Sequence, residues 1–279
     1  MVSRLKRGGM IVALTMIGTA GVATAGPIGQ TGQFSWVRHS GYYTGSGGEF
    51  TIGSYTGITN KSYVDTGNDL TSSKNIVSSP NFETFCLETG EYAASPSFFI
   101  VNSFAARGGG GVGATDQLSV GTAWLYSQFA KGTLNVSPVT VSGKLAGNYF
   151  STTASTAARS VEAGLLQQAI WWLEEEGGAF VTTNNSNYLS NPYAAAAVAQ
   201  FSSITGAKAN AASGYLGVYV LNNFKTEVAR NAFVANGTVL DGTKAQDFVY
   251  YSVPDGGTTL MLLGGALATL GAYRRKLNR

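Results

Sequence analysis

Few residue types in this chain could do chemistry, and two of them stand out. Cys86 is the only cysteine, in the segment Phe85-Cys86-Leu87-Glu88. One cysteine cannot form an intramolecular disulfide, so it is a buried inert thiol, an intermolecular link or a reactive nucleophile. The second is a glutamine in the stretch 165–176, which has the densest helical periodicity of the sequence. A thiol that attacks a glutamine carboxamide releases ammonia and forms a thioester.

Helical geometry separates the two neighbouring glutamines of that stretch. The apolar arc of the helix consists of Leu166, Ala169, Ile170 and Leu173. At about 100° per residue, Gln167 lies about 60° beyond Ile170, at the edge of the arc, whereas Gln168 lies about 160° away. A side chain at the edge can reach a strand packed against the helix, and one on the far side faces solvent. Geometry therefore favours Gln167 as the partner of Cys86.

Two short motifs carry a resemblance to a known family. The first is Phe85-Cys86-Leu87-Glu88. The second is Leu166-Gln167-Gln168-Ala169-Ile170-Trp171, whose Gln167 follows Cys86 by 81 residues. The pair resembles the thioester domains of bacterial surface adhesins, in which an aromatic-Cys motif and a later Gln motif, often ending in Ala-Ile-Trp, form an internal Cys–Gln bond. The resemblance spans about residues 80–176.

The resemblance implies an internal thioester between Cys86 and Gln167. Polar donors that face the developing oxyanion are expected to assist its formation. Apolar shielding by Phe85 and Trp171 is expected to slow its hydrolysis. An amine or hydroxyl on a partner then displaces the sulfur and becomes joined to Gln167. The expected function is adhesion through a covalent bond.

Ordinary packing is the competing interpretation of the same residues. A free cysteine is often a small buried hydrophobe, and glutamine is a good helix former. The run Glu174-Glu175-Glu176 is then most simply a solvated helix end. In that case the protein is a passive structural component of an extracellular polymer.

Other kinds of chemistry have weaker support. One histidine and one cysteine cannot build the usual zinc ligand sets. A Ser-His-Asp triad would require His39, which lies in a Gly/Ser/Tyr-rich region. Glu88, Glu91 and Glu174 could form a glycosidase-like carboxylate pair, but any protein with this many acidic residues offers such pairs. A secreted glycan-active enzyme is therefore the third-ranked function, and we expect no enzyme, metal or cofactor.

Composition and charge indicate an exported, β-rich protein. Hydrophobic residues make up 44% of the 279 residues and charged residues only 12%, and there are 37 glycines. These values exclude a disordered chain. Basic residues gather at the two ends, so that residues 26–253 hold 11 basic and 14 acidic residues, a net charge of −3. This balance does not fit a nucleic-acid groove, and we expect no nucleic-acid partner.

Short alternating segments separated by Gly and Asn predict the fold class. Strands are expected at 34–37, 48–55, 62–64, 82–88, 96–106, 215–221 and 247–253, and helices at 116–130, 165–176 and 193–201. In the strand 82–88, Cys86 and Glu88 share one face, and Phe85 and Leu87 share the other. We predict an α+β protein with a predominantly β body, sandwich or barrel-like, and a few helices.

Residues 1–25 have the pattern of a secretory signal peptide. A basic start precedes an apolar run from Met10 to Val22, and Ala23 and Ala25 form an A-x-A cleavage site. The apolar run is short for a membrane span. We expect export through the Sec translocon and removal of this segment.

Residues 253–279 combine a short motif, an apolar segment and a basic end. The motif is Val253-Pro254-Asp255-Gly256-Gly257, the apolar run extends from Leu260 to Tyr273, and the basic stop is Arg274-Arg275-Lys276. A cationic cluster holds such an end on the cytoplasmic side of the membrane. The tail resembles the PEP-CTERM sorting signals of Gram-negative bacteria, in the variant written Val-Pro-Asp-Ser-Gly, with Gly256 in place of serine. The resemblance implies an exosortase-type processing enzyme as a partner.

These parts define the expected organisation of the chain. A signal peptide (1–25) precedes an exported body (26–252), with the thioester-like region at about 80–176, and a sorting signal (253–279) follows. The C-terminal segment is expected to hold the protein transiently in the inner membrane before it reaches the cell surface or the extracellular matrix. There we expect a surface or polymer partner that carries an amine or a hydroxyl.

Overall fold

The structure is a computed structural model of the chain. It describes residues 27–38, 43–44, 47–58, 82–106, 115–141, 144–150, 156–176, 185–240 and 242–252. The signal segment with Ala23 and Ala25, the sorting tail from Val253 onward, His39 and the strand expected at 62–64 lie outside the described residues.

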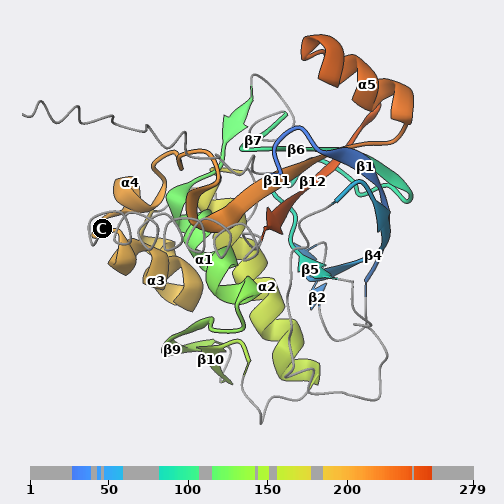
Figure 1. Cartoon of the computed structure of the whole chain (residues 1–279). Coiled ribbons are helices and arrows are strands. Elements are labelled where there is room, and N and C mark those ends of the chain that lie inside the picture. Colours follow the sequence, from blue (N-terminus) through green and yellow to red (C-terminus); the bar gives the residue numbers. More distant parts are fainter. Residues whose placement is uncertain are drawn as a thin grey trace, which may run out of the picture.

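A six-stranded antiparallel sheet is the largest part of the fold (Figure 1). Its strand order is β12-β11-β6-β1-β4-β5, and each neighbouring pair runs antiparallel. The strands are β1 (Thr31–Val37), β4 (Phe50–Thr56), β5 (Phe82–Thr84), β6 (Ser97–Asn102), β11 (Val218–Phe224) and β12 (Lys244–Tyr251). Aromatic and β-branched residues dominate β6, β11 and β12, and such side chains fit a pleated surface.

Three small hairpin-like pairs complete the strands of the described chain. They are β2 (Tyr43–Thr44) with β3 (Gly47–Gly48), β7 (Phe104–Ala105) with β8 (Asp116–Gln117), and β9 (Asn135–Val141) with β10 (Lys144–Asn148). The β2–β3 pair packs against helix α2 (Thr156–Leu173), and this contact forms one side of the site described below.

The sheet curls so that its two edges meet (Figure 1). β5 is one edge strand and β12 is the other, and Cys86, just after β5, forms an antiparallel bridge with Phe248 of β12. At the same seam, the N–H of Leu87 donates a hydrogen bond to the carbonyl of Asp247 at 3.0 Å. Cys86 therefore lies where the sheet closes on itself.

The helices cover one end of the curled sheet, apart from α5, which lies on its outer side (Figure 1). They are α1 (Val120–Ala130), α2, α3 (Pro192–Gln200), α4 (Ile204–Ala207) and α5 (Glu227–Asn236), with 3-10 turns η1 (Asn185–Ser190) and η2 (Tyr215–Gly217). α2 has 18 residues and packs against α1 and α3. The helix expected at 165–176 therefore begins nine residues earlier, at Thr156.

The C-terminal end of α2 differs from the solvated end that the sequence suggested. Glu175 takes the left-handed conformation (φ 59°), and the N–H of Glu176 bonds the carbonyl of Trp171 at 2.9 Å, which together form a Schellman-type cap. This reversal turns Glu174 and Glu176 into the protein, where both are buried, and only Glu175 is exposed. The expectation of three solvated glutamates was wrong, because a helix end that reverses sharply points its flanking side chains inward.

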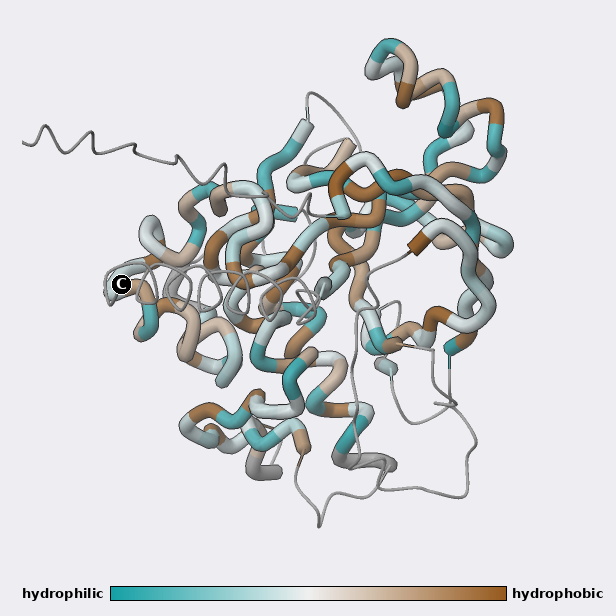
Figure 2. The backbone as a smooth tube through the Cα atoms, viewed as in Figure 1, coloured by the Kyte–Doolittle hydropathy of each residue, from teal (hydrophilic) through white to brown (hydrophobic). Residues whose placement is uncertain are grey.

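Two hydrophobic cores meet at the segment that carries the cysteine. One lies among the helices and includes Phe85, Leu87 and Phe129, and the other fills the curled sheet and includes Cys86 and Phe248. Figure 2 shows the hydrophobic positions along the central helices and the strands that supply these cores. Alternate residues of an extended segment face opposite sides, so residues 85–87 alternate between the two cores.

The predicted fold class is confirmed. The protein is α+β, with a curled antiparallel sheet and five α-helices among the described residues. The alternation expected around Cys86 is also present. Several boundaries were misplaced; for example, α1 begins at Val120 with Ser119 as its cap, and Asp116 belongs to β8.

Candidate functional site

The Gln167 carboxamide lies against the backbone of Cys86. Its Oε1 accepts a hydrogen bond from the Cys86 N–H at 3.0 Å, and its Nε2 donates one to the Cys86 carbonyl at 2.7 Å. Gln167 is fully buried, and Cys86 is 4% exposed. Gln168, which helical geometry predicted to face solvent, is half-buried, so it is the more exposed of the two glutamines. The structure thus brings together the two residues that the motifs singled out.

A second backbone N–H faces the same carboxamide oxygen. Gly48 of β3 donates to Gln167 Oε1 at 3.4 Å, so this oxygen faces two N–H groups from segments on opposite sides of the site. Two converging N–H donors are the arrangement that stabilises negative charge on a carbonyl oxygen when a nucleophile adds to its carbon. The φ of Gly48 is +119°, a conformation that other residues rarely adopt.

The strand that carries Gly48 is tied to the helix that carries Gln167. Glu49, the next residue, is buried and accepts a hydrogen bond from Arg159 Nη2 of α2 at 2.7 Å. It also accepts from the hydroxyl of Tyr149 at 2.7 Å. Arg159 lies about two turns before Gln167 on the same helix. Helix α2 therefore fixes both the Gln167 carboxamide and the strand whose Gly48 N–H donates to it.

Close packing leaves no free volume at this contact. A Cβ atom on Gly47 would lie 2.3 Å from Gln167 Cγ and 2.8 Å from Trp171 Cη2. Only glycine fits here without displacement of the glutamine side chain. The Gly47-Gly48 pair is the one local signal in the sequence for this part of the site.

A cavity of about 300 Å³ opens beside Cys86. Four aromatic side chains line it, those of Trp36, Phe50, Tyr92 and Trp171. Glu88 lines the same cavity, and Arg38 contributes a cation that stacks on Phe50, 5.1 Å from the ring centroid. The thiol residue therefore borders a space that a small molecule or a side chain can enter.

Some polar atoms of the residues that line this cavity are buried without a hydrogen bond. Within the described part of the chain, Trp171 Nε1 and Glu88 Oε1 are buried and make no hydrogen bond. The other oxygen of Glu88, Oε2, accepts from Gln246 Nε2 at 3.1 Å and from the Asp247 N–H at 3.2 Å. Glu88 is thus held by one oxygen, and its other oxygen is buried without a hydrogen bond.

Burial and charge both oppose ionisation of the thiol. Burial raises the pKa of Cys86 well above its usual value, the Glu88 carboxylate raises it further, and Arg38 lowers it. The thiol is therefore the resting form, and a proton must leave it before the sulfur can act as a nucleophile.

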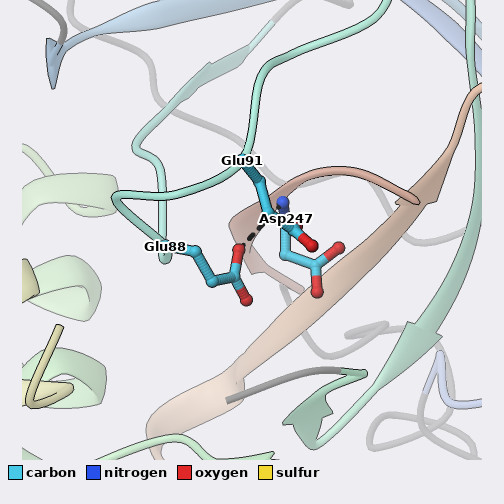
Figure 3. A group of neighbouring side chains, drawn as sticks. All are labelled: Glu88, Glu91 and Asp247. Atoms are coloured by element: carbon cyan, nitrogen blue, oxygen red, sulfur yellow. Dashed lines mark hydrogen bonds between the residues drawn. The ribbon is translucent and has the colours of Figure 1, made fainter. Parts of the chain in front are cut away.

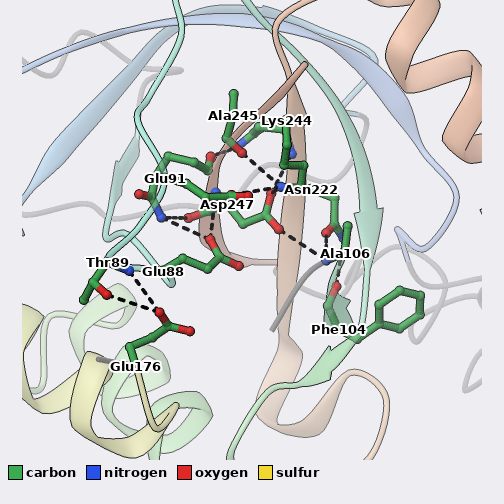
Figure 4. Close-up of polar contacts among 12 residues, drawn as sticks. Glu88, Thr89, Glu91, Phe104, Ala106, Glu176, Asn222, Lys244, Ala245 and Asp247 are labelled. Carbon is green, nitrogen blue, oxygen red and sulfur yellow. Dashed lines mark hydrogen bonds and ion pairs between the residues drawn. The ribbon is translucent and has the colours of Figure 1, made fainter. Parts of the chain in front are cut away.

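Three carboxylates gather behind the cavity, as Figure 3 shows for Glu88, Glu91 and Asp247. One oxygen of each lies within 4.8 Å of the others. The Lys244 ammonium bonds Asp247 and, at 3.3 Å, Glu91, so a cation supplied by the chain itself sits in the cluster (Figure 4). The buried acids are therefore neutralised in part by Lys244, and we assign no metal ion to them.

α2 also holds the segment after the cysteine. Glu176 accepts a hydrogen bond from the N–H of Thr89 at 3.1 Å (Figure 4). Glu174 accepts from the N–H and the hydroxyl of Ser119, at 3.1 and 2.7 Å, at the N-terminus of α1. An acidic side chain at that end of a helix is favourable. Glu174 does not line the cavity that Glu88 lines, so these two carboxylates do not face one another across it.

The two residues expected to shield the bond lie in different places. Trp171 lines the cavity with Cys86. Phe85 packs instead in the helical core, edge-on to Phe129 with ring centroids 5.0 Å apart. The expected shielding by Phe85 is corrected accordingly, because adjacent residues of an extended segment point to opposite faces.

The comparisons with known proteins concern the tail. A family model described as the VPDSG-CTERM motif matches residues 252–277. The chain therefore carries a PEP-CTERM-type sorting signal, as predicted, and this signal indicates an exported, surface-targeted protein. Such a motif is consistent with processing by an exosortase-like enzyme.

The body of the chain has no match in these comparisons. No curated protein and no solved structure matches the chain, and the resemblance to adhesin thioester domains gains no support from them. None of the helices in the described ranges is long and apolar enough to cross a membrane.

Proposed function

We propose that Cys86 and Gln167 form an internal γ-glutamyl thioester, through which the exported protein attaches covalently to a partner at the cell surface or in the extracellular matrix. The observation that carries the proposal is the buried Gln167 carboxamide, which bonds both backbone groups of Cys86 at 3.0 and 2.7 Å. A buried glutamine side chain needs hydrogen-bond partners, but many backbone groups could supply them. Here both partners belong to the only cysteine of the chain.

The formation step follows from these contacts. The Cys86 sulfur adds to the Gln167 side-chain carbon, and the N–H groups of Cys86 and Gly48 stabilise the negative charge on Oε1. The C–N bond then breaks, the thiol proton passes to the departing nitrogen, and ammonia leaves. Amides react slowly with nucleophiles. The fixed position of the Gln167 carboxamide next to Cys86 lowers the barrier, because the reacting groups are already oriented.

The attachment step reverses the same chemistry with a new nucleophile. An amine or hydroxyl that enters the cavity adds to the Gln167 carbonyl carbon, and the Cys86 sulfur leaves and regains a proton. The product is an amide or ester that joins Gln167 to the partner. Trp171 and the other aromatic residues of the cavity limit the access of water and so slow hydrolysis.

Intact mass of the secreted body tests the proposal. The wild-type chain is expected to be lighter than its sequence mass by one ammonia, and methylamine should add its own mass and free one titratable thiol. Cys86→Ala and Gln167→Glu should both retain the mass of their plain sequence. Gln168→Glu is the matched control, because it alters the half-buried neighbour on the same helix and should still lose ammonia.

A wild-type chain that keeps its full mass and a buried free thiol would exclude the thioester. A passive role in the extracellular polymer would then be the better account. Hydrolysis of a purified glycan that is lost in Glu88→Gln would instead indicate an enzyme.

A further inference from the structure

The unsatisfied oxygen of Glu88 lies in the same cavity as the cysteine. Glu88 follows Cys86 by two residues on the same side of an extended segment, a spacing of about 7 Å between Cα atoms. Both residues line the cavity, and Glu88 is 2% exposed. Burying a carboxylate oxygen without a partner costs free energy, so such an atom calls for a specific role.

Formation of a thioester requires a proton carrier at this position. The buried Cys86 must lose a proton when its sulfur attacks, and the nitrogen of Gln167 must gain one when it leaves. A general base acts within hydrogen-bond reach or through one water, and Glu88 and Cys86 line the same cavity. Gln246 and the Asp247 N–H hold Glu88 Oε2, whereas Glu88 Oε1 makes no hydrogen bond among the described residues.

We infer that Glu88 is the proton carrier of the proposed thioester: its Oε1 accepts the proton of the Cys86 thiol and delivers it to the departing ammonia. In the attachment step the same oxygen takes the proton of the incoming nucleophile and returns it to the Cys86 sulfur. Each half of the cycle leaves Glu88 in its starting form. This inference rests on the proposed function, because it assigns a residue to that reaction.

Several titratable groups surround Glu88. They are Asp247 and Lys244 of β12, Glu91 three residues after Glu88, Glu176 after α2 and the Cys86 thiol, and Arg38 lines the same cavity. Burial and Asp247 raise the pKa of Glu88 well above its usual value, whereas Lys244 lowers it. A carboxylate with a raised pKa is a stronger base, and proton transfer from a thiol of raised pKa costs less when the two values approach each other.

The test follows re-formation of the bond in folded protein. Treatment of the thioester with ammonia restores the Gln167 carboxamide and the Cys86 thiol, and removal of the ammonia starts the reaction again. The rate of mass loss is measured from pH 5 to 10 in the wild type, Glu88→Gln, Glu88→Asp and Glu91→Gln. Thermal unfolding of each variant shows whether it is folded.

We expect Glu88→Gln to re-form the bond about 100-fold more slowly at neutral pH, the lower end of what a general base contributes. The wild-type rate should rise as Glu88 loses its proton, and this rise should be absent in Glu88→Gln, which accelerates only as the thiol ionises. Glu91→Gln removes another carboxylate of the same cavity and should keep the low-pH rise, moved to lower pH because the Glu91 carboxylate raises the pKa of Glu88. Glu88→Asp should recover part of the rate and the low-pH rise.

The inference and the proposed function fail in different ways. A wild-type chain that never loses ammonia refutes the thioester itself. A wild type that loses ammonia while Glu88→Gln matches its rate and pH profile refutes the role of Glu88 alone. If Glu88→Gln does not fold, Glu88→Asp decides, because a wild-type rate with the shorter carboxylate would refute the inference.

Discussion

At the scale of single residues, burial separates side chains that look equivalent in the sequence. Gln167 and Gln168 are adjacent, yet only Gln167 is fully buried and bonded to Cys86. Glu174 and Glu175 are adjacent as well, yet Glu174 is buried at the α1 N-terminus and Glu175 faces solvent. The chemistry available to each residue is decided by these contacts rather than by its type.

Glu174 should make the stability of the fold depend on pH. Burial raises the pKa of Glu174 from 4.5 to about 7, although hydrogen bonds from Ser119 lower it. Because the folded state holds this proton more tightly than the unfolded state, the contribution is complete below pH 4.5 and is lost as the pH rises through 7. The shift corresponds to about 3 kcal/mol of unfolding free energy.

Urea unfolding between pH 4.5 and 8 measures this effect. The free energy of unfolding should fall over that range in the wild type, and Glu174→Gln should reduce the fall, while the raised pKa values of Glu88, Asp247 and Asp116 maintain the rest. Glu175→Gln, at an exposed position, is the control and should leave the slope unchanged. An equal slope in Glu174→Gln would show that another group is responsible.

At the scale of elements, α2 organises the site through contacts along its whole length. Arg159 anchors Glu49 next to β3, Gln167 bonds Cys86, and Glu176 bonds Thr89. Removing one partner of a buried ion pair such as Arg159–Glu49 costs about 3–5 kcal/mol. The helix thus fixes both segments that face the carboxamide, and the site does not depend on a free loop.

The packing of β3 on α2 gives a prediction for Gly47→Ala. The new Cβ would lie 2.3 Å from Gln167 Cγ, so the glutamine or the strand must move. We expect thioester formation, followed by intact mass, to be slowed or lost, with a loss of stability of about 1–3 kcal/mol from overpacking.

Gly53→Ala in β4 is the matched control for this change. A Cβ on Gly53 would meet its nearest atom at an ordinary 3.6 Å, and it should leave the mass loss intact. Normal thioester formation in Gly47→Ala would show that the tight contact does not position Gln167.

At the scale of the whole molecule, closure of the sheet and export belong to separate parts of the chain. The seam between β5 and β12 places Cys86 beside Phe248, which is 162 residues further along the chain. The sorting signal at 252–277 begins directly after β12. The strand that completes the site is therefore also the last element before the tail.

Deletion of 253–279 should change where the protein is located without changing thioester formation. The deleted chain retains β12 and is expected to fold and to lose ammonia as the full chain does, because its seam is intact. In the cells that export it, it should be released into the medium instead of remaining with the cell surface or matrix. Immunoblots of cell, matrix and medium fractions measure the distribution.

Gly256→Ser is the control for the deletion, since it restores the serine of the motif variant and should be processed at least as well. Retention of the deleted chain in the surface fraction would contradict the proposed role of the tail.

Local spacing and composition were sufficient for several features of this protein. The sorting tail, the α+β class, the opposite facing of Cys86 and Phe85, and the choice of Gln167 over Gln168 all follow from residues close together in the chain. Periodicities of 2 and 3.6 residues decide which face of an element a side chain occupies, and a sorting signal is read as a linear segment. These features could therefore be predicted before any long-range contact was known.

Only the tertiary structure decided which distant groups surround the two central residues. Gly48 precedes Gln167 by 119 residues, and Gln246 follows Glu88 by 158. The burial of Glu174 and Glu176 likewise depends on a helix end that turns into contacts with distant segments. Sequence spacing specifies a face but not what packs on it. Three features of the site therefore depend on the tertiary structure. They are the two N–H donors that face Gln167, the unsatisfied oxygen of Glu88 and the cavity beside Cys86.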